Sequence, residues 1–106
     1  MPKKSLDKKS DIGVMDRQKN EVEPPKKYKV VFHNDDYTSF QFVELILIQL
    51  FHKSATEARS IAKSIHHSGK GIAGVYSKEI AATKAHQVNI TARSSGVPLL
   101  AEIEPE

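Results

Sequence analysis

The sequence predicts a small α/β sandwich of the α+β kind, with helices packed on a three-stranded, mainly antiparallel sheet in the order β-α-α-β-α-β. Three observations support this two-layer fold. The chain has 106 residues, 39% of them hydrophobic and none of them cysteine, which suits one domain with a modest core and no disulfides. Three short stretches have the pattern of strands, and three longer ones have helical caps and apolar stripes. Three short strands need helices on one face to cover their apolar side chains.

The first 25 residues differ from the rest in composition. They are charged and polar, their few sizeable apolar residues follow no helical or strand period, and Glu23-Pro24-Pro25 closes the stretch. Such a segment cannot bury enough apolar surface to offset the entropy lost on ordering it. We therefore predict a disordered N-terminal extension over residues 1–25 and a compact domain over residues 26–106.

The domain is expected to open with a strand and a turn. Residues 28–32, with the sequence YKVVF, alternate in the way that a strand requires. Asn34-Asp35-Asp36 then interrupts the pattern. Short polar side chains bond to local backbone groups, so this run predicts a turn.

Two helices follow, each marked by a capping pattern. The T-x-x-Q pattern that starts at Thr38 predicts a helix that runs to about His52. The S-x-x-E pattern that starts at Ser54 predicts a second helix. Gly69 is placed to end it, because a left-handed conformation costs glycine little.

The remaining elements complete the sandwich. Residues 72–76 read as a short strand, and Ser77 caps a third helix that Gly96 and Pro98 bring to an end. The apolar stripe of this helix consists of Ala81, Ala85, Val88 and Ala92. Residues 99–103 form the last predicted strand.

Charge and composition narrow the classes of function. Lys and Arg number 16 against 13 Asp and Glu, and they are spread evenly, whereas nucleic-acid binders concentrate positive charge on one face. No apolar run approaches the roughly 20 residues that span a bilayer, and the first residues do not resemble a secretory signal. The spacing of histidines and carboxylates does not suggest a metal site. We expect a cytoplasmic protein without a metal or another cofactor.

The first predicted helix carries more apolar surface than one core needs. At about 100° per residue its large apolar side chains fill an arc of about 180°, whereas a core-facing stripe needs about 100°. Leu45 and Ile48 fall outside even this arc. The helix could be sandwiched between two other elements, or one edge could line an apolar pocket or dock a partner.

The Asn34-Asp35-Asp36 turn lies just before that helix and offers several hydrogen-bond acceptors. Such a group suits a cation that donates protons, such as an ammonium group. An ordinary turn, a carboxylate pair for acid/base hydrolysis and hard-metal ligation are alternatives. His66 ends the second helix, where a histidine can simply interact with the last carbonyls. The residue types alone leave these alternatives open.

Motifs throughout the domain form one recognisable set. They are YKVVFHNDDYT at residues 28–38, Phe42-Val43, Ile65-His66, Gly69-Lys70, Gly74-Val75-Tyr76, Glu79, Ala82-Thr83-Lys84 and Pro98-Leu99-Leu100. Together these residues resemble the ClpS family, bacterial adaptors that bring N-degron substrates to a Clp AAA+ protease. The resemblance spans about residues 26–103, which is essentially the whole domain.

The resemblance implies a site for the first residue of a peptide, which in this family is Leu, Phe, Tyr or Trp. By similarity, Asn34, Asp36 and His66 would hold the free α-amino group, and Asp35 would add negative potential. A pocket below them would receive the apolar side chain. Its implied lining is Thr38, Phe40, Val43, Ile46, Ala62, Ile65 and Leu99.

Two of these positions depart from the family pattern. Phe40 and Ala62 both stand where many members have methionine. Phenylalanine is stiffer than methionine and alanine removes wall volume, so the preference between aromatic and aliphatic first residues stays open. On the third predicted helix, Glu79 and Lys84 match positions that the family uses against the unfoldase.

The resemblance therefore implies a non-catalytic adaptor, monomeric when free, that binds neither nucleic acid nor a membrane. Its expected partners are N-degron proteins and the N-terminal domain of a ClpA-type AAA+ unfoldase. A small RNA- or ribosome-associated binding module is the alternative, because similar sandwiches occur there. A hydrolase that uses Asp35, Asp36 and His66 is a third hypothesis.

Overall fold

The computed structural model describes residues 26–106 of the chain. Its elements are β1 (Lys27–His33), α1 (Phe40–Phe51), α2 (Ala55–Ser68), β2 (Lys70–Ser77), α3 (Lys78–Ser94) and β3 (Leu100–Pro105). The predicted order β-α-α-β-α-β is confirmed. The N-terminal extension predicted over residues 1–25 lies outside the described residues.

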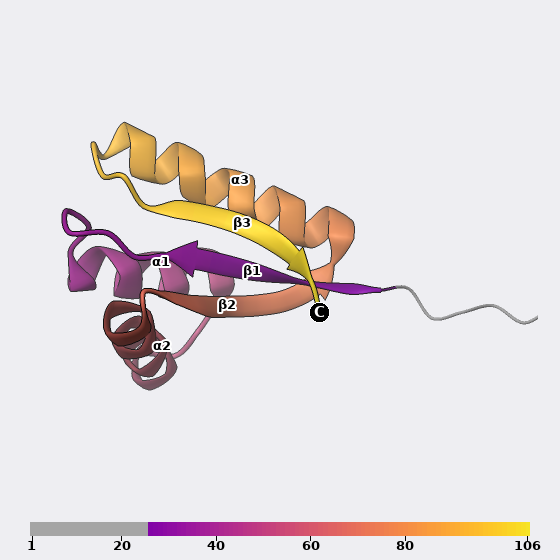
Figure 1. The fold of residues 1–106 in the computed structure, drawn as a ribbon, viewed down its shortest axis with the longest axis horizontal. Helices are drawn as coiled ribbons and strands as arrows, with labels where there is room; N and C mark the ends of the chain where they lie inside the picture. Colours follow the sequence, from indigo (N-terminus) through magenta and orange to yellow (C-terminus); the bar gives the residue numbers. More distant parts are fainter. Residues whose placement is uncertain (1–25) are drawn as a thin grey trace, which may run out of the picture.

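The three strands form one sheet in the order β2-β1-β3 (Figure 1). β1 pairs antiparallel with both neighbours, so the sheet is wholly rather than mainly antiparallel. The register with β2 shifts between Val30 and Val31, which inserts an irregularity into the edge strand. The pairing of β3 with β1 continues to Glu106, whose backbone N–H donates to the Lys27 carbonyl at 2.9 Å.

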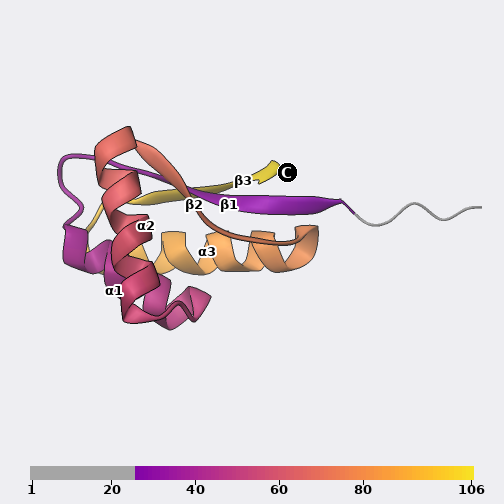
Figure 2. The ribbon, with the colours of Figure 1, turned by 90° about the horizontal axis from the view of Figure 1, so that it is seen from below.

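Helices α1 and α3 lie on one side of the sheet. Figure 2 shows α1 and α3 beneath the strands, while α2 rises steeply beside them to the start of β2. The core between these layers combines strand residues with the apolar stripes of all three helices. Val30 and Phe32 of β1 and Leu47 of α1 have no exposed surface. No helix in residues 26–106 has the length and hydropathy needed to cross a membrane.

The ends of the helices show which capping predictions were right. Ser54 and Glu57 form the predicted capping box of α2, and Gly69 ends that helix with φ of 89°. The predicted cap of α1 was wrong by one residue. Ser39, not Thr38, accepts the Phe42 N–H, because the Thr38 backbone and hydroxyl are bonded to Asp35 in the preceding turn.

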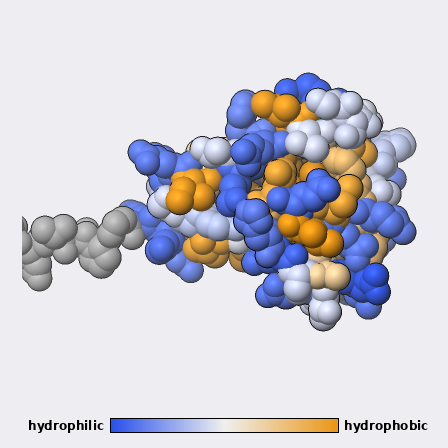
Figure 3. Space-filling view, turned by 180° about the vertical axis from the view of Figure 1, so that it is seen from behind, coloured by the Kyte–Doolittle hydropathy of each residue, from blue (hydrophilic) through white to orange (hydrophobic). Residues whose placement is uncertain are grey.

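The broad apolar arc of α1 is divided among several surroundings. Val43, Ile46, Leu47 and Phe51 are buried in the core. Phe40, Phe42 and Leu50 are half-buried against it. The helical side of the molecule is shown in Figure 3, where apolar side chains gather between hydrophilic ones. Leu45 and Ile48 of α1 are exposed.

Candidate functional site

The loop between β1 and α1 is held by one carboxylate. Oδ1 of Asp35 accepts the backbone N–H groups of Tyr37 at 2.8 Å and Thr38 at 2.7 Å. Oδ2 of Asp35 accepts the Thr38 hydroxyl at 2.6 Å. A short acidic side chain that bonds the backbone two and three residues ahead fixes a turn. Asp35 is half-buried, whereas Asp36 beside it is exposed.

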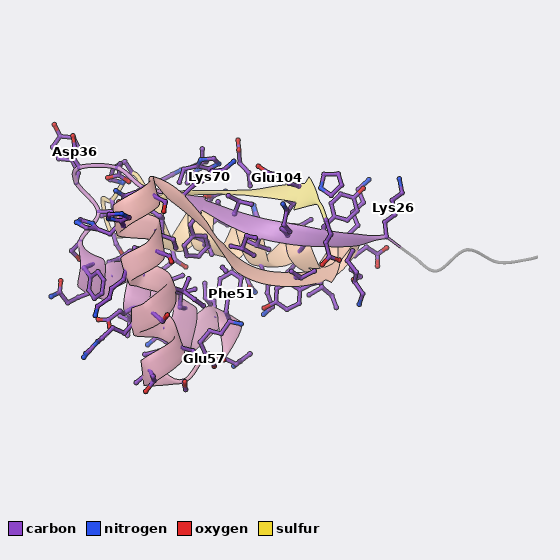
Figure 4. All side chains as sticks on the ribbon, turned by 60° about the horizontal axis from the view of Figure 1, so that its bottom comes forward. Lys26, Asp36, Phe51, Glu57, Lys70 and Glu104 are labelled. Carbon is purple, nitrogen blue, oxygen red and sulfur yellow. The ribbon has the colours of Figure 1, made fainter. Side chains whose placement is uncertain are left out.

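A backbone bond joins this loop to the end of α2. The Asn34 N–H donates at 2.9 Å to the carbonyl of Gly69, the left-handed residue that ends the helix. Asn34 is therefore beside the last turn of α2, which carries His66. Figure 4 shows Asp36 at the outer end of the loop, on the same side of the molecule as this end of α2.

His66 lies against Phe40, one residue of the predicted apolar pocket. Its ring is exposed and meets the Phe40 ring edge-on, with centroids 6.5 Å apart and planes at 89°. Phe40 is the first residue of α1 and is half-buried against the core. Asn34 and His66 thus lie where the loop, α1 and α2 meet. All three predicted amine-binding side chains have an acceptor atom, and Asn34 alone among them is half-buried.

The apolar residues predicted for the pocket are part of one packed cluster. Val43, Ile46, Ala62, Ile65 and Leu99 are all buried, with 1–4% of their surface exposed. Thr38 is buried too, with 7% exposed. An open pocket large enough for a Leu or Phe side chain would expose its walls. Six of the seven are therefore buried rather than exposed along an open pocket, and half-buried Phe40 is the most exposed of them.

Two cavities in the described part of the chain lie at other positions, and one of them shares Leu99 with this cluster. One of about 440 Å³ is between α2 and the outer side of the sheet, and none of the seven residues lines it. Another, of about 300 Å³, lies where α3 meets β3 and has Leu99 in its wall together with Asn89. Asn89 bonds both backbone groups of Ala101, a contact that the sequence patterns did not predict. The available signal was a weak helix former directly after a buried position of a long helix.

The two residues predicted to face the unfoldase have different surroundings. Glu79 is exposed in the first turn of α3. Lys84 is half-buried, and its Nζ donates to the Leu50 carbonyl near the end of α1 at 2.7 Å. The same ammonium lies 5.5 Å from the Phe51 ring centroid and 5.4 Å from that of Tyr76. Lys84 therefore links α3 to α1, whereas the Glu79 side chain is exposed.

Within residues 26–106, no three His, Cys, Asp or Glu side chains come together as ligands of a metal would. Away from the loop, burial raises the pKa of the Tyr76 phenol. The loop and the last turn of α2 offer an amide, a carboxylate and an imidazole above an apolar cluster.

Comparison with known proteins gives a consistent result. A family model described as ATP-dependent Clp protease adaptor protein ClpS matches residues 23–102. The chain is 42% identical over 103 residues to an ATP-dependent Clp protease adapter protein ClpS of Desulfatibacillum aliphaticivorans, which covers 96% of this chain and 99% of that protein. It is 49% identical over 83 residues to the ClpS of Clostridium acetobutylicum, covering 78% and 82%.

A solved structure is similar as well. The structure of Agrobacterium tumefaciens ClpS2 bound to L-phenylalaninamide superimposes with a TM-score of 0.76. The two sequences are 36% identical, and the match covers 78% of this chain and 100% of the other.

Proposed function

Because the chain belongs to the ClpS family of Clp protease adaptors, we propose that it binds the first residue of N-degron proteins and delivers them to a ClpA-type AAA+ unfoldase. The recognised features are the free α-amino group and a bulky apolar side chain, namely Leu, Phe, Tyr or Trp. The adaptor is proposed to act in the cytoplasm, as a monomer that contacts the N-terminal domain of the unfoldase.

The observation that carries this proposal is the ligand of the related ClpS2 structure. L-phenylalaninamide presents a free α-amino group and a benzyl side chain, as the first residue of a peptide does. That relative is 36% identical to this chain and matches it over the whole of its own length. The same two features fit the acceptors and the apolar cluster found where the loop, α1 and α2 meet.

The amine is assigned to three acceptors. An α-ammonium has three N–H donors, which the Asn34 amide oxygen, the Asp36 carboxylate and a neutral His66 nitrogen can accept. Asp35 has a different task, because its two oxygens already accept three hydrogen bonds within the loop. It contributes negative charge and holds Asp36 in place.

The side chain is assigned to the apolar cluster under the loop. Because the cluster is buried, its most exposed member Phe40 has to turn aside before a Leu or Phe side chain can enter. Burying such a side chain is worth roughly 1.5–3 kcal/mol, and each charge-assisted hydrogen bond roughly the same. Micromolar binding requires about 8 kcal/mol, so neither half of the site is sufficient alone.

The binding test uses fluorescent peptides that differ at the first residue only. A peptide that starts with Phe or Leu should bind, and acetylation of its amine should abolish binding because the charge and two donors are lost. Asp36→Ala and His66→Ala should each weaken binding by at least about tenfold. Equal binding of the acetylated peptide would show that the amine is not recognised.

Delivery requires a second measurement. A reporter protein that begins with Phe should be degraded by a ClpA-type unfoldase and its peptidase faster when this protein is added. Glu79→Ala should reduce that acceleration without changing the affinity for the free peptide, since Glu79 is exposed and on another helix. A reporter that is degraded at the same rate with and without the adaptor would contradict the delivery step.

A further inference from the structure

Asn89 is bonded to the last strand through both ends of its side-chain amide. It lies in α3 and is half-buried. Its Nδ2 donates to the Ala101 carbonyl at 3.0 Å, and its Oδ1 accepts the Ala101 N–H at 2.8 Å. A carboxamide presents one donor and one acceptor side by side, as a peptide group does. Asn89 therefore pairs with Ala101 in the way that a neighbouring strand would.

The position of Ala101 explains why such a partner is useful. β3 is at one edge of the sheet in the described part of the chain, and Ala101 stands opposite Phe32 of β1. Along an edge strand every second residue directs its N–H and C=O away from the neighbouring strand. Ala101 is 3% exposed, so these groups could not be satisfied freely by water. Asn89 satisfies both of them and fixes β3 against α3.

This contact lies close to a residue of the proposed pocket. Leu99 precedes Ala101 by two residues, and both side chains are in the core, at 4% and 3% exposure. On the other side of Leu99, the Val97 N–H donates to the Ala92 carbonyl at 2.9 Å. Leu99 therefore lies between two residues that are hydrogen-bonded to α3, Val97 and Ala101.

We propose that Asn89 is a positioning residue for the apolar pocket: its amide fixes Ala101 and thereby sets where Leu99 stands in the wall. The inference rests on the proposed function, because it assigns Asn89 a part in selecting the first residue of the substrate. Asn89 itself is not expected to touch the peptide, since its amide is occupied by the backbone of β3.

The first test measures the dissociation constants of peptides that begin with Phe and with Leu. Asn89→Ala should weaken Phe-peptide binding by about tenfold and change the ratio of the two constants, because one wall of the pocket is no longer held. Asn89→Asp keeps the acceptor but turns a carboxylate oxygen toward the Ala101 carbonyl, so its effect should be at least as large. Gln87→Ala, which removes an exposed amide from the same helix, should bind like the wild type.

A double-mutant cycle with Leu99→Ala separates positioning from a general loss of stability. If Asn89 acts through Leu99, the loss in the double variant should be clearly smaller than the product of the two single losses. Losses that multiply would overturn the proposal. So would an Asn89→Ala protein whose active fraction falls while its dissociation constants and their ratio stay at the wild-type values.

One further readout distinguishes failure of this inference from failure of the proposed function. Amide hydrogen exchange at Ala101 should speed up in Asn89→Ala and not in Gln87→Ala, whatever the protein binds. If the wild type fails to bind the Phe peptide, the proposed function is wrong and the pocket role of Asn89 falls with it. If the wild type binds the Phe peptide but exchange at Ala101 is unchanged in Asn89→Ala, only the proposed positioning role of Asn89 is overturned.

Discussion

Replacing Asp35 by alanine should damage the loop that presents Asp36, because one carboxylate organises that loop. The side chain accepts two backbone N–H groups and one hydroxyl, at 2.6–2.8 Å. Two of the three donors belong to Thr38, which is 7% exposed. After the substitution the Tyr37 N–H can bond to water, since that residue is 83% exposed, but the Thr38 groups cannot do so without opening the loop.

The expected cost follows from the buried donors. A buried donor left without a partner costs about 1–3 kcal/mol. The hydroxyl of Thr38 can rotate toward another acceptor, so the two donors together should cost about 2–4 kcal/mol. A domain of about 80 residues has roughly 4–12 kcal/mol of stability in total. Asp35→Ala should therefore remove a large fraction of it and lower the melting temperature by about 10–30 °C.

Asp35→Asn is the matched control for this prediction. Oδ1 of the amide can still accept both backbone N–H groups, and its NH₂ can donate to the Thr38 hydroxyl oxygen. The variant loses the charge, keeps the two bonds from the backbone and reverses the direction of the third, so its free energy of unfolding should change by less than about 1 kcal/mol. Urea unfolding followed by circular dichroism measures both variants.

Two results would refute this reasoning. An Asp35→Ala protein with the wild-type urea midpoint would show that the three bonds do not hold the loop. An Asp35→Asn protein as unstable as Asp35→Ala would show that charge, and not the pattern of acceptors, is decisive. Peptide binding adds a readout: Asp35→Asn should bind the Phe peptide within a few-fold of wild type, whereas Asp36→Asn should lose about tenfold or more.

Three further predictions concern the elements around the site. Lys84→Met removes the 2.7 Å bond to the Leu50 carbonyl but keeps the apolar stem, and it should lower the free energy of unfolding in urea by about 1–2 kcal/mol. Gly71→Ala would place a Cβ 2.6 Å from Cγ1 of Ile65, so α2 must shift from β2 at a cost of about 1–3 kcal/mol in the same assay. Burial raises the pKa of the Tyr76 phenol, so folding favours its protonated form. The matching stability is complete below about pH 10 and is lost as the pH rises through the raised pKa, which urea midpoints of the wild type and Tyr76→Phe at pH 9–12 would measure.

Matched variants control these measurements. Glu79→Ala changes an exposed charged residue of α3 and should unfold like the wild type. If Glu79→Ala and Lys84→Met lost the same free energy of unfolding, the internal bond of Lys84 would not explain the loss. An unchanged urea midpoint for Gly71→Ala would mean that α2 can yield without cost. Tyr37→Phe alters a tyrosine that is 83% exposed, and it should lose stability at alkaline pH as the wild type does. The same alkaline loss in Tyr76→Phe would contradict the role of the buried phenol.

The order of the elements could be predicted because the signals for it are local. Strand alternation at residues 28–32, the Ser54–Glu57 capping box and the left-handed glycine at Gly69 each depend on a few neighbouring residues. The one cap predicted wrongly, Thr38, shows the limit of such patterns. The Thr38 hydroxyl donates to the Asp35 carboxylate in the preceding turn, and the hydroxyl of Ser39 accepts the helix N–H of Phe42 instead.

The residue types of the candidate site were also visible in the sequence, but only through the resemblance to a family. Composition and spacing left the Asn34-Asp35-Asp36 run open between a turn, an amine site, a metal site and a hydrolase. The structure divides the run, with Asp35 occupied inside the loop and Asp36 exposed. The roles of the individual side chains toward a substrate stay predictions.

The sequence by itself determined which segments become strands and helices, because capping and hydrophobic periodicity act over a few residues. Tertiary structure alone decided the pairings between distant segments. Examples are the Asn34 N–H on the Gly69 carbonyl, the ammonium of Lys84 at the end of α1, and the amide of Asn89 on the edge of β3. Each joins residues 12 or more positions apart, and a polar side chain finds such a partner only when packing has fixed both elements. No local pattern encodes that choice, because the competing partner before folding is water.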